Sequence, residues 1–293
     1  MSATALALVL TAALLHASWN LVAKRAGGGN HFVLLTAFFV SLLWAPVAVW
    51  AGAMAAGQIG LRAWAVLAAS ALIHVLYFRT LLHGYSVADL TVVYPVARGS
   101  GPLLTSLGAV MLLGERLSLV SAAGALAVVV GVFLIAGGTR LWRQVHDATQ
   151  RAALRRGVAW GALTGFFIAG YSIVDGYAVK VLLLSPILVD YVGNLLRVPV
   201  MLPFALRDRR GFLQALREQW KPALVVATLG PASYVMVLYA LTMAPLSHVA
   251  PAREVSMLFA ALMGGHLLAE GDRAPRVVGA VAIALGVAGL ALG

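Results

Sequence analysis

Long apolar stretches, separated by short polar or basic connections, follow one another along the whole chain. A helix of about 20 apolar residues crosses the hydrocarbon core of a bilayer, and stretches of that length lie almost end to end here. We therefore predict an all-α polytopic membrane protein with ten transmembrane helices. Their residues are 2–23, 32–51, 63–83, 90–113, 117–136, 157–179, 184–206, 222–243, 247–268 and 275–292.

The sequence repeats itself internally. Four residues return in the second half at one constant offset: Arg98, Glu115, Gly124 and Gly131, as Arg253, Glu270, Gly279 and Gly286. Each half holds five predicted spans, and this odd number makes the second copy enter the membrane from the opposite side. We predict two inverted five-helix repeats around a central cavity, at residues 1–136 and 157–293, joined by a basic loop at 137–156.

The repeated glycines predict one helix contact. Gly124 and Gly131, like Gly279 and Gly286, are seven residues apart and therefore lie on one face of their helix. Small residues at such a spacing let two membrane helices approach closely. We expect the fifth and tenth spans to pack against each other or against a second subunit.

Composition excludes a soluble protein. Hydrophobic residues make up 62% of the chain and charged residues only 11%, against roughly 25% charged in soluble domains. The chain has no cysteine, which excludes disulfides, thiolate metal sites and cysteine nucleophiles. The N-terminus lacks a basic segment and a small-residue cleavage site, so we expect residues 2–23 to be retained as a span.

The net charge of +11 is distributed by side of the membrane. Fourteen Lys and Arg lie in or beside the connections at 24–31, 137–156, 207–221 and 269–274, whereas the opposite connections hold Arg62, Arg116 and Lys180. Basic loops face the cytoplasm. We predict a multi-pass protein of the bacterial inner membrane with cytoplasmic basic loops, both termini periplasmic, lipid as its surroundings and no nucleic-acid partner.

Prolines precede both repeated arginines. Pro95 and Pro251 each remove a backbone donor and should kink or break a helix close to Arg98 and Arg253. Paired interruptions of this kind indicate the binding site of a transporter, because exposed backbone is tolerated only beside protein or a water-filled cavity. A simple packing kink is the alternative. We assign both prolines as hinges.

The two arginines allow two interpretations. Each could bind a substrate carboxylate, or each could pair with a neighbour such as Glu254 and join the helices. An intramembrane charge costs about 2.5–3.5 kcal/mol on insertion scales. Two arginines beside one acidic residue leave a surplus of positive charge, which favours an anionic group on the ligand.

Aromatic and polar residues at matching depths in the two halves complete the candidate site. They could receive an apolar side chain or an ammonium, although aromatic residues near helix ends also form interfacial belts. The predicted substrate-binding residues are Trp19, Asn20, His74, Tyr77, Phe78, Tyr94, Arg98, Tyr171, Tyr234, Arg253 and Glu254.

Other intramembrane polar residues have weaker cases. His16, His74 and His248 are candidates for proton coupling because histidine titrates near neutral pH, and His74 is the first of them. We expect Asp175 to be structural and shallow enough to reach interfacial water or Lys180. Spacings of four and three place Asp190, Asn194 and Arg197 on one face, where internal pairing is the first interpretation and cavity lining the second.

A sequence motif supports a family resemblance. Residues 112–118, Leu-Leu-Gly-Glu-Arg-Leu-Ser, are echoed at 267–272 by Leu-Leu-Ala-Glu-Gly-Asp, and a proline two or three residues before an arginine precedes each. With the five-plus-five organisation, the chain resembles the EamA-type branch of the drug/metabolite transporter superfamily, and most of all the YddG-type amino-acid exporters. The resemblance covers essentially the whole chain and implies export of amino acids from the bacterial cytoplasm, with the proton gradient as energy source. Ala269 replaces the usual glycine, so the second turn is formed differently.

We therefore predict a secondary transporter that exports amino acids or similar zwitterions by alternating access. A multidrug or other metabolite exporter is the alternative, and a membrane enzyme using His83 and Asp89 is a weaker one because no catalytic motif is present. No nucleotide-binding pattern appears. We expect no catalytic residue, cofactor or metal, and a monomer suffices because the duplication supplies both halves.

Overall fold

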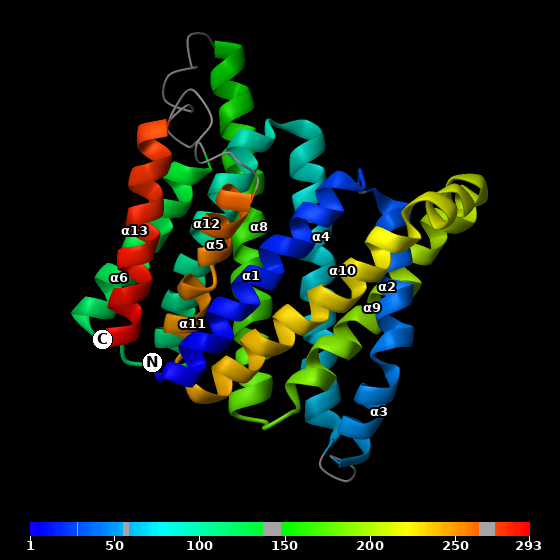
Figure 1. Cartoon of the computed structure of the whole chain (residues 1–293), viewed down its shortest axis with the longest axis horizontal. Helices are drawn as coiled ribbons and strands as arrows, with labels where there is room; N and C mark the ends of the chain where they lie inside the picture. Colours follow the sequence, from blue (N-terminus) through cyan, green and yellow to red (C-terminus); the bar gives the residue numbers. More distant parts are fainter. Residues whose placement is uncertain (28, 55–58, 137–147, 264–272) are drawn as a thin grey trace.

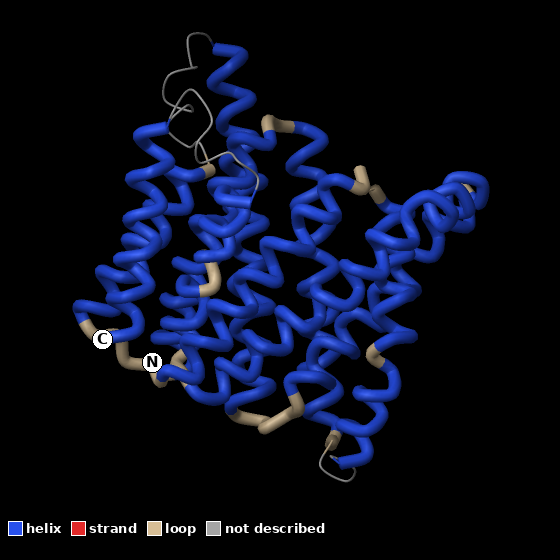
Figure 2. Tube along the Cα trace, viewed as in Figure 1, coloured by secondary structure: helices blue, strands red, loops and turns tan. Residues whose placement is uncertain are grey.

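The structure, a computed structural model, describes residues 1–27, 29–54, 59–136, 148–263 and 273–293. Within these residues every regular element is a helix, as the apolar pattern predicts (Figures 1 and 2). The helices are α1 (Ala3–Arg25), α2 (Asn30–Leu43), α3 (Ala45–Met54), α4 (Leu61–Val87), α5 (Leu90–Leu113), α6 (Leu119–Ile135), α8 (Ala148–Lys180), α9 (Pro186–Arg207), α10 (Arg209–Met243), α11 (Leu246–Ala252), α12 (Val255–Met263) and α13 (Arg273–Leu292).

The described helices follow the order of the predicted spans, but two of the predicted spans are each divided into two helices. Six are long and apolar enough to cross a membrane, namely α1, α4, α5, α8, α10 and α13. The second predicted span is a pair, α2 and α3, bent by 51°, and would be a seventh. Helix α6 has 17 residues. The ninth predicted span consists of the short helices α11 and α12, and its residues 264–268 lie outside the described part.

Two helices begin before the apolar stretch that predicts them. Helix α8 starts at Ala148, so residues 148–156 are helical where the sequence predicted a loop; residues 137–147 lie outside the described part. This segment is rich in alanine and arginine, which favour helix without a lipid environment. Helix α10 likewise starts at Arg209, where the Asp208 carboxylate accepts the Gly211 backbone N–H at 3.0 Å and caps the helix.

The repeated glycines form the contact between α6 and α13, which lie side by side in Figure 1. A Cβ atom at Gly124 would lie 2.7 Å from the Gly286 carbonyl oxygen, and one at Gly131 only 2.6 Å from that of Gly279. The relation holds in reverse, since added Cβ atoms at Gly286 and Gly279 would meet the Gly124 and Gly131 oxygens. The predicted packing of these two spans against each other is confirmed.

A second close contact joins α5 and α8. Gly157, Gly161 and Gly165 recur every fourth residue on one face of α8 and leave no room for a Cβ beside α5. At Gly161, for example, the added atom would lie 2.8 Å from the Val93 carbonyl oxygen. Helix α5, which carries Arg98, is therefore held against a long rigid neighbour.

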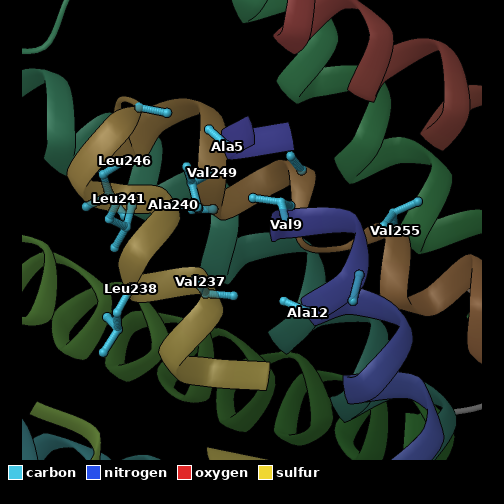
Figure 3. Packing of buried hydrophobic residues seen from close by; sticks show 14 of the residues in the cluster. Ala5, Val9, Ala12, Val237, Leu238, Ala240, Leu241, Leu246, Val249 and Val255 are labelled. Carbon is cyan, nitrogen blue, oxygen red and sulfur yellow. The ribbon is translucent and has the colours of Figure 1, made fainter. Parts of the chain in front are cut away.

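The two chain termini meet on one face of the bundle, at the lower edge of Figure 1. The N-terminal ammonium of Met1 donates to the Ala291 carbonyl oxygen at 2.8 Å. The largest apolar core lies in this half of the molecule, between the first part of α1, the last part of α10 and α11. Figure 3 labels ten of its residues: Ala5, Val9, Ala12, Val237, Leu238, Ala240, Leu241, Leu246, Val249 and Val255.

Candidate functional site

A cavity of about 460 Å³ lies between α1, α4, α5, α6, α12 and α13. It extends from Arg98 to Lys24 in the last turn of α1 and Arg276 in the first turn of α13. The described residues of its wall are His16, Ala17, Asn20, Leu21, Lys24, Tyr85, Tyr94, Arg98, Ile135, Ser256, Met257, Ala260, Ala261 and Arg276. The wall therefore carries three cations and, among these residues, no carboxylate.

Arg98 is paired and also faces the cavity. Its guanidinium lies 3.0 Å from the Glu254 carboxylate and donates to the Ser256 hydroxyl at 3.3 Å. The Nε–H of Arg98 is buried and has no hydrogen-bond partner within the described residues. Of the two interpretations of the arginine, pairing with Glu254 is observed, and the side chain also lines the cavity.

Glu254 is shared by both repeated arginines. Its side chain is 1% exposed, and its second oxygen lies 3.6 Å from the Arg253 Nε. These contacts are ion pairs rather than aligned hydrogen bonds. Arg98, Arg253 and Glu254 together carry a net charge of one positive unit, which favours a negative group on a ligand beside Arg98.

A break in the helix positions Arg253 and Glu254. Pro251 has no N–H for the Ser247 carbonyl, which instead accepts the Ser106 hydroxyl of α5 at 3.2 Å. The chain then turns tightly between α11 and α12, with the Glu254 N–H donating to the Pro251 oxygen at 3.0 Å. Helix α5, by contrast, continues as a helix through Pro95. The interruption is thus confined to the second of the two repeated elements.

Four predicted aromatic residues gather behind the arginines. The His74 ring stacks on Tyr171 at a centroid distance of 4.0 Å, and the rings of Tyr77 and Tyr234 stand edge-on to Tyr171 at 5.6 and 6.4 Å. Arg253 donates to the Tyr171 hydroxyl at 3.2 Å. These side chains do not line the 460 Å³ cavity, and neither does Arg253, the charged group that Tyr171 contacts.

Asp175 lies in this cluster, which corrects the prediction of a shallow residue that reaches interfacial water or Lys180. It is 0% exposed and accepts hydrogen bonds from the hydroxyls of Ser70 and Tyr234. Residues five apart in a helix point about 140° away from each other, so Lys180 lies on another face. The expectation considered depth along the helix and not the direction of the side chain.

Trp19 and Phe78 lie apart from the other predicted residues. Trp19 packs edge-on against His16 at 4.9 Å and joins a small apolar cluster of α1, α2 and α10. Phe78 lines a separate cavity of about 530 Å³ with Arg79 and His83. Of the predicted residues, Asn20, Tyr94 and Arg98 are the three in the wall of the 460 Å³ cavity.

Several cavity residues were missed by the sequence reasoning. His16 and Lys24 lie four residues before and after the predicted Asn20 in α1, and this spacing could have indicated one polar face. Tyr85 lay beyond the predicted end of the third span at residue 83, but α4 continues to Val87 and brings the ring to the cavity. Ser256 follows the helix break and carried no pattern that would have revealed it.

The opposite end of the bundle is held closed by Glu115. Its carboxylate accepts the backbone N–H groups of Leu246 and Ser247, at 2.7 and 2.8 Å, in the first turn of α11. The ammonium of Lys180 donates to it at 2.8 Å and also to the Ala244 oxygen at 3.1 Å. We call Glu115, Lys180 and residues 244–247 the latch. The repeat partner Glu270 lies outside the described residues.

The hydrogen bonds of the latch change the acidity of Glu115. Burial acts to raise the pKa of its carboxyl, but the Lys180 ammonium and the two backbone N–H groups outweigh burial. The pKa of Glu115 therefore lies below its ordinary value, and the carboxylate stays charged.

Comparison with known families identifies the second half of the chain. Residues 155–292 match the EamA-like transporter family. Residues 155–292 are therefore an EamA-like transporter domain of the drug/metabolite transporter superfamily, and the described residues include six helices long and apolar enough to cross a membrane. Proteins of this family are transporters rather than enzymes.

The fold itself is shared over the full chain. A solved structure described only as "Crystal structure of protein" is similar to it with a TM-score of 0.71 and 20% sequence identity, over 100% of this chain and 96% of the other. At this identity the similarity concerns the fold alone. No curated protein matches the chain.

Proposed function

We propose that this protein is a secondary transporter that exports small metabolites, amino acids first among them, by alternating access. The observation that carries the proposal is the cavity beside Arg98, which combines an arginine with an unused donor, an amide and aromatic rings at the middle of a membrane bundle. Substrate sites of transporters with this architecture lie near the bilayer midplane, where broken helices expose polar groups.

An amino acid fits the described wall of this cavity. Its carboxylate would bind the guanidinium of Arg98, which lines the cavity. Asn20 donates to the His16 carbonyl at 2.8 Å, and its amide oxygen remains available to accept from an ammonium. The rings of Tyr94 and Tyr85 offer a surface for the side chain or for cation–π contact. Trp19, Phe78 and the buried aromatic residues then support the site from outside the cavity.

The two ends of the bundle support alternating access. The cavity extends toward the basic ends of α1 and α13, whereas the apolar core and the latch close the end where the termini meet. Exchange between two such states needs two halves that move against each other, and the reciprocal contact of α6 and α13 supports a pair of inverted five-helix repeats. Pro251, beside the helix break, and Pro95 are the proposed hinges.

We place the basic ends in the cytoplasm of a bacterium and both termini in the periplasm, with a monomer as the working unit. Reporter fusions at each terminus test the orientation: phosphatase fusions active at both ends support it, and inactive ones at both ends reverse it.

The decisive test is flux of radiolabelled amino acids in proteoliposomes holding the purified protein, against empty vesicles. We expect flux for at least one amino acid, and a loss of about tenfold or more in Arg98→Ala, since a charged hydrogen bond contributes about 1.5–3 kcal/mol. Arg217→Ala, which removes an exposed arginine on α10, is the matched control and should transport normally. Unchanged flux in folded Arg98→Ala contradicts the site.

One observation favours a second substrate class. The described cavity wall carries cations and no carboxylate, so an organic anion without an ammonium would also be stabilised there. Competition assays separate the two classes, because an amino acid and the matching carboxylic acid without its amino group should compete unequally. If the deaminated acid competes as well as the amino acid, the substrate class is organic anions. Cationic drugs are disfavoured by the same charges.

A further inference from the structure

A second cavity, of about 530 Å³, lies between α4, α8 and α9, beside the start of α2. Its described wall combines apolar side chains, such as Leu76, Leu82 and Met201, with the polar groups of Arg79 and His83. Leu76 and Leu82 are 36% and 40% exposed, so the cavity opens to the surroundings of the bundle. It shares no described wall residue with the 460 Å³ cavity and is therefore a separate site.

One face of α4 leads into this cavity and changes from apolar to polar along the helix. Leu72, Leu76, Arg79, His83 and Ser86 follow one another at spacings of four and three residues, which places them on one face. All five residues are exposed. The face therefore presents hydrocarbon first, then a cation with an imidazole ring, and last a hydroxyl.

The length of α4 places Arg79 at the level of lipid headgroups. Helix α4 is one of the six helices able to cross a membrane. Arg79 follows Arg62 by 17 residues, with no Asp, Glu, Lys or Arg between them. This separation is about 26 Å along a helix, close to the roughly 30 Å of the hydrocarbon core. Helix α4 ends, and α2 begins, toward the edge of the bundle opposite the termini (Figure 1).

The charges of the cavity favour an anionic ligand. The described wall contains no Asp or Glu, and within the described part of the chain Arg79 has no ion-pair partner. The His83 ring stands edge-on to Trp160 of α8 at 4.4 Å, and both line the cavity with Arg79. The Thr80 and Ser86 hydroxyls donate to carbonyl oxygens of their own helix. Arg79 and His83 therefore keep donors for a ligand.

We propose that this cavity binds one anionic phospholipid, with its phosphate on Arg79 and His83 and an acyl chain along Leu76 and Leu72. The order of groups along α4 is the order of groups in a phospholipid that lies beside the helix. Basic pockets between transmembrane helices bind anionic headgroups in other proteins. A zwitterionic phospholipid is bound less well, because its own cation offsets the attraction of Arg79. The inference does not depend on the proposed function.

The apolar half of the face distinguishes a lipid from a free anion. Leu72 is 60% exposed and lies seven residues before Arg79, about two helix turns toward the membrane interior. A free phosphate would contact the polar end of the face and leave Leu72 unchanged. A phospholipid that reaches Arg79 also brings an acyl chain to Leu72.

Quenching of a fluorophore beside Leu72 tests for selective lipid binding, because the chain has no cysteine and one can be introduced alone. A fluorophore on Leu72→Cys, in phosphatidylcholine vesicles, should be quenched by chain-spin-labelled phosphatidylglycerol at about a fivefold lower mole fraction than by chain-spin-labelled phosphatidylcholine. Arg79→Gln should remove this preference, and Arg79→Lys should keep it. Leu126→Cys is the matched control, since it is 56% exposed on α6, a helix without Lys or Arg, and should show no preference.

Each other outcome overturns the proposal. Equal quenching by the two lipids at Leu72→Cys, or a preference that persists in Arg79→Gln, excludes a lipid site on Arg79. Loss of the preference in inorganic phosphate, at matched ionic strength, identifies a site for a free anion. Quenching by neither lipid means that protein, such as a second copy of the chain, covers the groove. Quenching at Leu126→Cys in the Arg79→Gln background shows that the variant is inserted.

A second measurement needs no label. A ligand that binds the folded state raises its thermal midpoint. In neutral detergent, added phosphatidylglycerol should therefore raise the midpoint of the wild type and of Arg217→Gln, an exposed site on α10, more than that of Arg79→Gln. Equal shifts in the three proteins contradict the site.

Discussion

At the scale of single residues, Glu115 shows how one carboxylate joins three segments. Glu115 itself follows the end of α5. Its carboxylate accepts a hydrogen bond from the Lys180 ammonium at the end of α8 and from two backbone N–H groups at the start of α11. Donors at a helix N-terminus have no partner within the helix, so a carboxylate is well placed there. In the sequence Glu115 was visible only as a repeated motif residue.

Replacing Glu115 with Gln should loosen the closed end. The amide keeps the shape but loses the charge, and each hydrogen bond to a charged group contributes about 1.5–3 kcal/mol. Ala12 lies in the core of that end. We expect a cysteine introduced as Ala12→Cys to react with a maleimide about tenfold or more faster when Glu115 is also replaced by Gln than when Glu115 is kept. Glu218→Gln, an exposed carboxylate on α10, is the control. Equal reaction rates in both variants contradict the latch.

The lowered pKa of Glu115 predicts a pH dependence with a definite sign. A carboxyl whose folded pKa lies below its unfolded value stabilises the fold above the unfolded pKa, and this stability is lost as pH falls through the folded pKa. The difference in thermal midpoint between wild type and Glu115→Gln should therefore be constant near neutral pH and shrink in acid. A difference that grows on acidification contradicts the assignment.

At the scale of elements, glycines on one face of a helix allow its neighbour to approach closely. At the α6 and α13 contact the obstacle to a larger side chain is the backbone of the partner helix, which cannot rotate away. The contact also relates each half to the other, because the same two positions of each repeat take part in it.

Gly131→Ala should destabilise the protein by about 1–3 kcal/mol, as overpacking does. Its Cβ would lie 2.6 Å from the Gly279 carbonyl oxygen, so the two helices must separate. Gly230→Ala in α10 is the matched control, because nothing lies within 4 Å of its added Cβ, and alanine favours a helix by about 1 kcal/mol. Thermal unfolding in detergent should show a lower midpoint for Gly131→Ala and no lowering of the midpoint for Gly230→Ala. Equal midpoints contradict the contact.

The elements were easier to predict from the sequence than the site. Apolar stretches indicate helices because lipid leaves the backbone no other partner, and spacing alone predicted the contact through Gly131. Helix ends and side-chain directions are decided by packing instead, so Tyr85 was missed and Trp19 was assigned to a wall it does not form. The chemistry of Asp175 depends on α4 and α10, which no local pattern could bring to it.

At the scale of the whole molecule, the described residues leave a cavity toward one end of the bundle and fill the other end. The cavity extends from Arg98 toward Lys24 and Arg276, and the core in Figure 3 together with the latch fills the end where the termini meet. Under the proposed function the protein exposes the same site to each side in turn, and this arrangement is one of those two states.

Labelling of one introduced cysteine tests this account most directly, because the chain contains no cysteine of its own. Ala260→Cys places a thiol in the cavity wall. A membrane-impermeant maleimide added on the side of Lys24 and Arg276 should label it faster than the same reagent added on the side of the termini, and a transported amino acid should slow that labelling. Equal labelling from both sides, with no protection by any transported amino acid, would contradict a substrate cavity that opens to one side at a time.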